Sequence, residues 1–233
     1  MYVITGSSSG LGHAVSLKLK ELNLDFITVD RYGNPDYLID LSNIDNINNF
    51  VQELKNSFDH IDGLVTCAGV FSNLEKIIKT NYFGTVNLVS KIYEEFNEVN
   101  ALLIGSVLSK TYELDFDLID NLLKSKDYNN SFNYNISDTK CYASCKKALD
   151  GWAELFLKNK NTARINIVHP SLIKTEMTES FLNSHILESI FGKATMRDYL
   201  DIEELADIIV YMLTKAKSIN GQKIFVDKGI YNV

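Results

Sequence analysis

The sequence is poor in the residues that mark several classes of protein. Its 233 residues include only 2 prolines and 3 cysteines, and the cysteines are Cys67, Cys141 and Cys145. Three cysteines at this spacing suit neither a disulfide scaffold nor a zinc site, so we expect no metal centre. Cys141 and Cys145 lie one helical turn apart, as a redox pair would, but buried free thiols are the better interpretation.

Long apolar runs and blocks of like charge are also missing. No apolar run approaches the roughly 18 residues of a membrane span, and no basic segment or cleavage site precedes the apolar residues after Met1. The formal net charge is −7, without an acidic or basic block. That distribution argues against a nucleic-acid surface. We therefore expect a cytoplasmic protein that binds neither membranes nor nucleic acids.

What remains is the composition of an ordinary globular α/β protein, with 45% apolar and 23% charged residues. Apolar runs alternate with amphipathic helical patterns, and no repeat or linker interrupts them. This alternation predicts one Rossmann-like domain over residues 1–233, in which a doubly wound parallel sheet of about seven strands carries helices on both faces. Strands are expected at 2–4, 26–29, 37–39, 61–66, 101–105, 164–168 and 223–226, and helices from residue 12 and at 46–58, 74–96, 139–158 and 202–213.

Three stretches depart from regular alternation. Residues 31–36, between the second and third strands, are too few for a crossover helix. Residues 110–138 form an irregular insert, with a helix at about 116–123. Residues 176–200 are expected to cover the substrate pocket, and their apolar side chains suit either an apolar lid or a surface helix packed on the core. Those side chains are Phe181, Leu182, Ile186, Leu187, Ile190 and Phe191.

The first strand runs into a glycine-rich turn and then a helix. Residues 2–12 read Tyr-Val-Ile-Thr-Gly-Ser-Ser-Ser-Gly-Leu-Gly, with Gly6, Gly10 and Gly12 in the turn. Glycine lets the backbone approach a ligand closely, and the unpaired N–H groups of a helix start attract an anion. The spacing Gly-x-x-x-Gly-x-Gly differs from that of longer dinucleotide-binding domains and is weak by itself. The strand before it and the helix after it favour a phosphate cradle.

Three further residues suggest acid–base chemistry. Tyr142 and Lys146 are four apart on one predicted helix, so their side chains share a face. A nearby ammonium favours the phenolate and brings the tyrosine closer to acting as an acid–base group. Ser106 ends a predicted strand, at the edge where open α/β sheets bind ligands. Each of these signals occurs by chance in other proteins.

Taken together and in order, these motifs resemble the short-chain dehydrogenase/reductase family. The matching set, which covers nearly the whole chain up to Val226-Asp227, is Thr5-Gly6-x-x-x-Gly10-x-Gly12, Ala68-Gly69, Asn81, Ser106, Tyr142-x-x-x-Lys146 and Pro170-x-x-x-x-Thr175. Asp30-Arg31-Tyr32, the short 31–36 connection and the insert look most like the bacterial 3α-hydroxysteroid dehydrogenase/carbonyl reductase branch. Departures at Thr66-Cys67, Pro170-Ser171 and Asp227-Lys228 concern cofactor geometry and remove no catalytic group.

The resemblance implies a catalytic role for four residues. Tyr142 would exchange a proton with the substrate oxygen, to which Ser106 would hydrogen-bond. Lys146 would hold the nicotinamide ribose and lower the pKa of the tyrosine, and Asn81 would fix a proton-relaying water. The implied cofactor-binding residues are Gly6, Ser8, Ser9, Gly10, Leu11, Gly12, Asp30, Arg31, Asp40, Leu41, Cys67, Ala68, Gly69, Tyr142, Lys146, Pro170, Ser171, Ile173 and Thr175.

The resemblance also implies an NAD(P)-dependent oxidoreductase that interconverts a secondary alcohol and a ketone. Asp30 can bind both adenosine-ribose hydroxyls and repel a 2′-phosphate, so NAD(H) is expected over NADP(H), although Arg31 acts in the opposite sense. Asp40 would accept a hydrogen bond from the adenine amino group, near the Leu41 amide. The insert lies beside the helices through which family tetramers pair, and we therefore favour a homodimer.

Two alternatives remain open. A nucleotide-sugar epimerase or dehydratase shares Tyr-x-x-x-Lys, but such chains usually have a Gly-x-x-Gly-x-x-Gly loop and a longer C-terminal substrate domain. A regulator that senses dinucleotides without turnover commonly lacks the tyrosine or the lysine, whereas Tyr142 and Lys146 are both present. A ketone-dependent loss of NADH absorbance distinguishes an enzyme from such a sensor.

Overall fold

Seven parallel strands form one sheet in the order β3-β2-β1-β4-β5-β6-β7, in a computed structural model that describes residues 1–125, 134–160, 162–175, 178, 186–187, 190, 196 and 198–230. The strand order reverses between β1 and β4, as in doubly wound folds, so the predicted fold class is confirmed. The strands are β1 (Tyr2–Thr5), β2 (Phe26–Asp30), β3 (Tyr37–Leu38), β4 (Gly63–Thr66), β5 (Asn100–Ile104), β6 (Arg164–Pro170) and β7 (Lys223–Val226).

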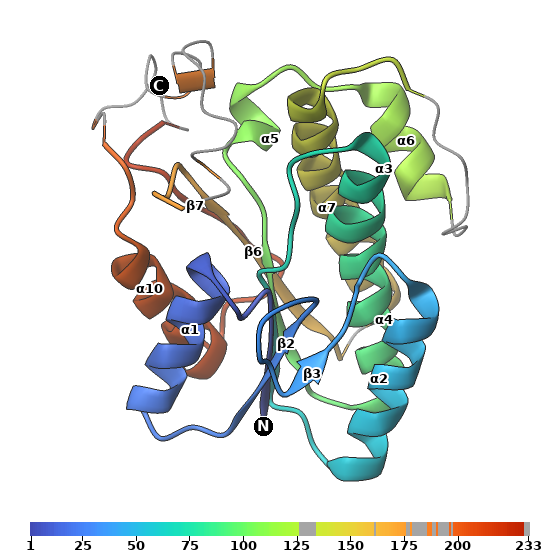
Figure 1. Ribbon diagram of the computed structural model, residues 1–233, viewed down its shortest axis with the longest axis vertical. Coiled ribbons are helices and arrows are strands. Elements are labelled where there is room, and N and C mark those ends of the chain that lie inside the picture. Colours follow the sequence, from blue (N-terminus) through green and yellow to red (C-terminus); the bar gives the residue numbers. More distant parts are fainter. Residues whose placement is uncertain are drawn as a thin grey trace.

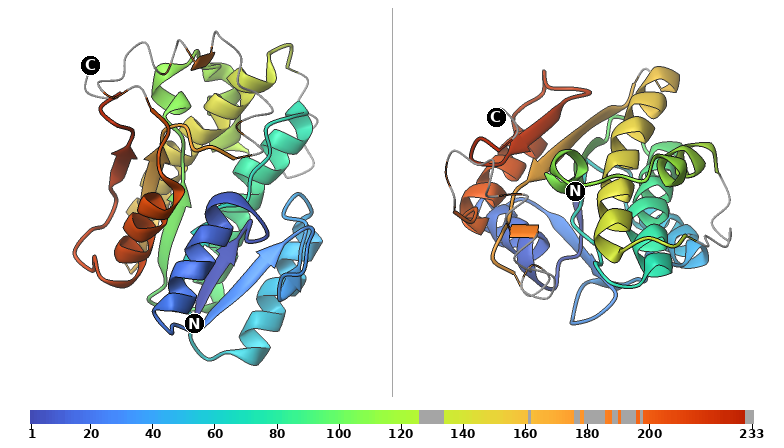
Figure 2. Two further views of the ribbon diagram at one scale, coloured as in Figure 1. Left: turned by 60° about the vertical axis from the view of Figure 1, so that its left-hand side comes forward. Right: turned by 90° about the horizontal axis from the view of Figure 1, so that it is seen from above.

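Helices cover both faces of the sheet (Figures 1 and 2). On one face, α1 (Gly10–Glu21) packs against α10 (Ile202–Thr214), and on the other lie α2 (Ile44–Ser57), α4 (Thr85–Glu95) and α7 (Asp138–Asn159). The shorter helical elements are α3 (Leu74–Ile77), the π-helical η1 (Ile78–Gly84), α5 (Leu108–Thr111) and α6 (Phe116–Lys124). None of the helices in the described part of the chain is long and apolar enough to cross a membrane.

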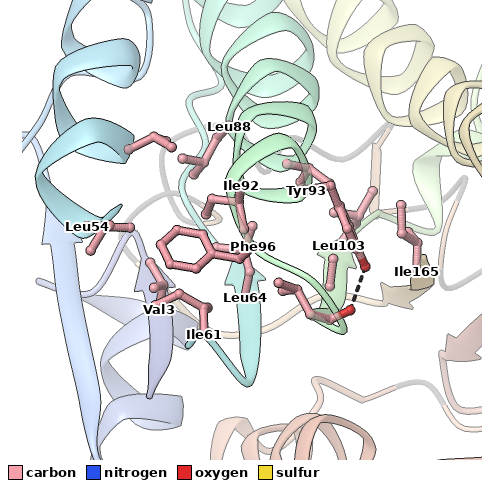
Figure 3. Packing of buried hydrophobic residues seen from close by; sticks show 14 of the residues in the cluster. Val3, Leu54, Ile61, Leu64, Leu88, Ile92, Tyr93, Phe96, Leu103 and Ile165 are labelled. Atoms are coloured by element: carbon pink, nitrogen blue, oxygen red, sulfur yellow. Dashed lines mark hydrogen bonds between the residues drawn. The ribbon is translucent and has the colours of Figure 1, made fainter. Parts of the chain in front are cut away.

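The core on the α2/α4/α7 face is built from one side of the strands and the apolar stripes of these helices. Figure 3 shows Phe96 among Val3, Leu54, Leu64 and Ile92, all buried. Strands of a parallel sheet are covered on both faces, so both sets of side chains of each strand are mainly apolar. For that reason the strand positions can be predicted from the sequence.

The opposite core is closed by a polar contact as well as by apolar packing. Asn100, almost completely buried at the start of β5, donates from Nδ2 to the Met212 carbonyl at 3.1 Å and the Leu213 carbonyl at 2.8 Å. Both carbonyls belong to the last turn of α10, where the helix offers them no internal partner. This contact fixes the end of α10 to the sheet.

Some details of the helix predictions are wrong. The first helix begins at Gly10, two residues before the predicted start, and its apolar residue Leu17 is 42% exposed. Ala14, Val15 and Leu19 suffice to cover the sheet beside α10. The predicted helix 74–96 is interrupted by the π-helical turn η1, which carries Asn81. π-Helical turns often occur at functional sites. No proline or glycine stands at the start of η1, so the sequence does not predict it.

The insert contains the helix expected of it and packs on the main body of the protein. Leu118 and Leu122 of α6 are fully buried against η1 and α7. The Tyr82 hydroxyl donates to the Leu122 carbonyl at 3.1 Å, and a Cβ added to Gly151 would lie 3.1 Å from Leu123. The insert is therefore part of the folded core at the carboxyl end of the sheet (Figure 1).

The segment expected to cover the pocket is anchored at its base. The Leu200 N–H donates to the Leu172 carbonyl at 2.8 Å, and Ile173 pairs with Leu200 in an isolated parallel bridge. Ile186 and Ile190 are buried against Leu172 and its apolar neighbours. Phe181, Leu182 and Phe191 lie outside the described residues.

Candidate active site

A cavity of about 600 Å³ runs across the carboxyl ends of the strands, where open α/β sheets bind their ligands. Its polar half lies over the turn between β1 and α1, and its other half reaches α7 and the segment after β6. Predicted site residues that line it are Gly6, Ser9, Gly10, Leu11, Gly12, Asp30, Arg31, Asp40, Leu41, Cys67, Ala68, Gly69, Ser106, Tyr142, Lys146, Pro170, Ser171, Ile173 and Thr175. Ser8 and Asn81 do not line it.

The glycine-rich turn is shaped as a cradle that side chains would fill. A Cβ at Gly12 would lie 2.2 Å from the Gly6 carbonyl oxygen, and one at Gly6, whose φ is +67°, would lie 2.6 Å from the Ala68 nitrogen. The N-cap residue of α1, Ser9, makes no side-chain bond to the first helical N–H groups. The backbone thus presents unpaired donors at a helix N-terminus, which suits the pyrophosphate of a dinucleotide.

The loop after β2 is tied to this cradle by hydrogen bonds. The Asp30 carboxylate accepts the Ser8 N–H at 2.9 Å and the Arg31 N–H at 2.7 Å. The Ser8 hydroxyl donates to the Tyr32 carbonyl at 2.7 Å, and the Ser9 and Tyr32 hydroxyls lie 2.9 Å apart. Ser8 therefore connects two loops. Tyr32 also lines the cavity. The sequence does not predict it as a site residue, because its contact with Ser9 depends on how the two loops fold.

Tyr142, Lys146 and Ser106 come together at the other half of the cavity, as predicted. Tyr142 and Lys146 occupy successive turns of α7, and the Lys146 ammonium lies 5.6 Å from the centre of the Tyr142 ring. Lys146 donates to the Ile104 carbonyl at 2.7 Å, at the end of β5. Two residues later, Ser106 lies beside Tyr142, and its side chain acts to lower the pKa of the phenol.

Burial decides the ionisation of this group. It raises the pKa of Tyr142 to about 12, although the hydrogen bond with Ser106 acts in the opposite direction, and it lowers the pKa of Lys146 to about 8. The expected lowering of the tyrosine pKa by Lys146 does not appear, because loss of solvation raises the pKa of Tyr142, and Ser106, not Lys146, acts against it. At neutral pH Tyr142 carries its proton and can donate it.

Asn81 is completely buried behind the cavity wall. Its Oδ1 accepts the Val70 N–H at 2.8 Å, and its Nδ2 donates to the Val70 carbonyl at 2.8 Å. The side-chain amide is thus occupied by the loop that follows β4. Asn81 holds that loop, and its part in fixing a water stays a prediction.

The end of the cavity beyond Tyr142 is largely apolar. The Tyr142 ring packs against Phe71 with ring centres 4.8 Å apart. The other apolar residues of this wall are Val70, Val107, Leu108, Leu172 and Ile190. The Thr175 hydroxyl lies 2.9 Å from that of Thr178. The protonated hydroxyl of Tyr142 therefore lies between this apolar compartment and a groove of the size of a dinucleotide.

The chain matches two family models that together cover most of its length. Residues 1–111 match the model described as short chain dehydrogenase, and residues 131–231 match the one described as Enoyl-(Acyl carrier protein) reductase. Among relatives, a 3-oxoacyl-(acyl-carrier-protein) reductase of Buchnera aphidicola is 26% identical over 99% of this chain and 96% of its own. A coniferyl-alcohol dehydrogenase of a Pseudomonas species is 24% identical over 98% and 95%.

Solved structures show the same architecture. The 3-alpha-hydroxysteroid dehydrogenase of a Pseudomonas species, solved in complex with NADH, superposes with a TM-score of 0.84 at 26% identity and covers 98% of this chain and 96% of its own. A short chain dehydrogenase of Burkholderia cenocepacia, in complex with NADP, reaches a TM-score of 0.76 at 18% identity and covers 100% and 97%. At 18% identity, the similarity to the Burkholderia cenocepacia structure shows a shared fold alone.

Proposed function

Because the chain belongs to the short-chain dehydrogenase/reductase family, an oxidoreductase family that uses nicotinamide cofactors, we propose that it is a cytoplasmic NAD-dependent enzyme that interconverts a secondary alcohol and a ketone. One observation carries the proposal. The half-buried Tyr142, which carries its proton at neutral pH, lies beside Lys146 and Ser106, where the dinucleotide-shaped groove opens into an apolar compartment. All strands described belong to one sheet, which supports a single domain.

The cradle fits a dinucleotide because its close backbone approach, which a Cβ at Gly6 or Gly12 would prevent by collision with the main chain, leaves the N–H groups at the start of α1 beside the cavity. A bound nicotinamide dinucleotide supplies or accepts the hydride. The backbone N–H groups at the start of α1 hold the pyrophosphate, Asp30 accepts hydrogen bonds from the adenosine ribose, and Lys146 donates to the nicotinamide ribose. The main chain of Ile173 and the hydroxyl of Thr175 hold the carboxamide and so orient the ring.

The remaining steps belong to the residues around the substrate oxygen. Tyr142 donates its proton to the ketone oxygen, and Ser106 hydrogen-bonds that oxygen as negative charge develops on it. Lys146 would lead the replacement proton toward Tyr142 from a water that Asn81 fixes. In alcohol oxidation the same groups act in reverse.

The proposal is tested with a panel of ketones and alcohols, each assayed with NADH or NAD and with NADPH or NADP. We expect ketone-dependent loss of NADH absorbance, strongest for substrates with an apolar body. Conversion of a nucleotide sugar without net cofactor consumption would favour an epimerase or dehydratase. Tight NADH binding with no turnover of any compound would favour a dinucleotide sensor.

Cofactor preference is the first quantitative prediction, and it rests on the loop after β2. A 2′-phosphate would meet the Asp30 carboxylate, and the bonds of Ser8 and Ser9 to Tyr32 close the space beyond it. Arg31 lines the cavity and attracts the phosphate, but residues 7–9 supply no second cation. We expect kcat/KM to favour NADH over NADPH by at least about tenfold, or roughly 1.4 kcal/mol.

Asp30→Ala should reduce the preference for NADH over NADPH, because it removes the repulsion between the carboxylate and the 2′-phosphate and leaves Arg31 in place. Asp36→Ala is a matched control, because Asp36 bonds to Thr28 and does not line the cavity. It should leave the ratio of the two kcat/KM values unchanged. Equal or better kcat/KM with NADPH in the unaltered protein would contradict the preference.

The quaternary structure is a second prediction from the fold. In family tetramers, the long helix that carries Asn81 and the helix that carries Tyr142 pair with the same helices of a neighbour. Here α6 packs on both of these elements, with Leu118 and Leu122 buried against them. The insert thus covers part of that pairing face, and we expect a homodimer. Multi-angle light scattering measures the mass directly, and a stable tetramer would refute the blocking role of α6.

A further inference from the structure

His169 is a buried titratable residue that the proposed chemistry does not use. It lies near the end of β6 with no exposed surface, and its ring stacks on Phe225 with ring centres 4.6 Å apart. The ring presses so closely on β5 that a Cβ at Gly105 would lie 2.5 Å from its Nδ1. A polar ring in this position needs partners for both of its nitrogens.

The partner of one nitrogen comes from the helix that carries the catalytic pair. Asp150 follows Tyr142 and Lys146 at the same four-residue spacing, so α7 presents all three on one face. Asp150 is 1% exposed, and its Oδ1 lies 3.0 Å from His169 Nε2. Burial raises the pKa of Asp150, but His169, Lys147 and Lys223 together hold it below its ordinary value. An ionised carboxylate 3.0 Å from Nε2 favours a proton on that nitrogen, although the two atoms are not aligned for a hydrogen bond in this structure.

The other nitrogen then faces the catalytic serine. With its proton on Nε2, the neutral ring offers Nδ1 as an acceptor, and the Ser106 N–H lies 3.2 Å from it. Nδ1 also lies at hydrogen-bond distance from the Ser106 carbonyl, at 3.1 Å, and from the Ser109 hydroxyl, at 3.2 Å. That hydroxyl donates to the Ser106 carbonyl at 2.7 Å. Side chains therefore serve both backbone groups of Ser106 at the point where β5 leaves the sheet.

We propose that Asp150 and His169 form a positioning dyad that sets Ser106 relative to Tyr142. Lys146 already fixes the Ile104 carbonyl, and the dyad fixes Ser106 two residues later. The helix that bears the proton donor thus holds the residue that must hydrogen-bond the same substrate oxygen. An error of about 1 Å in such an arrangement costs roughly 10²-fold in rate. The inference rests on the proposed function, since it assigns Ser106 to the substrate oxygen.

Two variants of similar size separate the two nitrogens. In His169→Asn the amide oxygen can stand near Nδ1 and accept the Ser106 N–H, whereas in His169→Gln the amide nitrogen can reach the Nε2 position and donate to Asp150. We expect His169→Gln to lower kcat for ketone reduction by about tenfold or more, and His169→Asn to keep it within about threefold of the unaltered enzyme. Calorimetry should show the same NADH affinity in both variants.

A purely structural role predicts a different outcome. Both variants would then lower the denaturation midpoint by the same amount and leave kcat per folded molecule unchanged. That result would overturn the proposal. Equal losses of kcat in His169→Gln and His169→Asn would also overturn it. If the variants fail to fold, Asp150→Asn preserves volume, and it should lower kcat at constant NADH affinity. An unchanged kcat in Asp150→Asn would also overturn the dyad.

A substrate-free measurement keeps this inference separate from the proposed function. In protein labelled with ¹⁵N-histidine, the His169 resonances, identified by their loss in His169→Asn, should show a protonated Nε2 and an unprotonated Nδ1 at pH 7. The opposite tautomer would overturn the dyad even in an active enzyme. A protein that shows the expected tautomer and reduces no ketone would instead count against the proposed function.

Discussion

Tyr142→Phe is expected to keep NADH binding and to lose nearly all ketone reduction, by about 10²–10⁴-fold in kcat. The phenyl ring can occupy the same place against Phe71, so the packing of the site is preserved. Only the hydroxyl beside Ser106 is removed, and with it the proton that the ketone oxygen must receive. Steady-state NADH consumption and calorimetry measure the two quantities separately.

Tyr82→Phe is the matched control for this prediction. The Tyr82 hydroxyl is buried and hydrogen-bonded to the Leu122 carbonyl of α6, and neither Tyr82 nor Leu122 lines the cavity. Its removal should lower the free energy of unfolding by about 1 kcal/mol and leave kcat unchanged. If Tyr142→Phe retained more than about a tenth of the rate, Tyr142 would not be the proton donor.

Lys146→Met is expected to weaken NADH binding by about 10–100-fold and to abolish most turnover, because it removes charged hydrogen bonds to the ribose worth roughly 1.5–3 kcal/mol. The same substitution should stabilise the protein at pH 7. Burial lowers the pKa of Lys146 from 10.5 to about 8, and this shift corresponds to a penalty of about 3 kcal/mol for the charged form. Loss of the donor to the Ile104 carbonyl offsets part of that gain, so a net rise of about 1 kcal/mol is expected.

The pH dependence of that gain follows from the direction of the pKa shift. Below about pH 8 the folded protein holds the buried ammonium, and the penalty is fully present. Between about pH 8 and 10.5 the unfolded chain binds more protons than the folded protein, so the unaltered protein gains stability as pH rises. The advantage of Lys146→Met in urea denaturation should therefore shrink over this range.

Lys91→Met is the control, because Lys91 lies at the surface of α4, where its ammonium is 3.5 Å from the Glu94 carboxylate. It should change neither NADH affinity nor stability by more than about 0.5 kcal/mol. Unchanged NADH affinity in Lys146→Met would show that Lys146 does not hold the ribose.

The strands and most site residues could be predicted because the signals are local. A strand covered on both faces must be apolar throughout, and a phosphate cradle needs glycine where any Cβ would collide, as at Gly6 and Gly12. Tyr142 and Lys146 share a helical face by spacing alone. Each of these constraints acts within a few residues, and a single sequence displays it.

Features that depend on tertiary contacts were missed. The contact of Tyr32 with Ser9 spans 23 residues, and the hydrogen bonds of Asn81 go to a loop that precedes it by 11. The exposure of Leu17 depends on how much of α1 the sheet and α10 can cover. The raised pKa of Tyr142 follows from burial, which the spacing to Lys146 does not reveal. His169 gave no signal, since its partners Asp150 and Ser106 lie on two other elements.

The most direct test of the central claim follows the hydride itself. The unaltered enzyme is incubated with the ketones of the panel and with NADH that carries deuterium at both C4 positions of the nicotinamide, and the alcohol is analysed by mass spectrometry. We expect one deuterium on the carbinol carbon of the product, and none when Tyr142→Phe replaces the enzyme for the same time. An alcohol without deuterium, or no alcohol despite tight NADH binding, would contradict the assignment of this protein as an alcohol–ketone oxidoreductase.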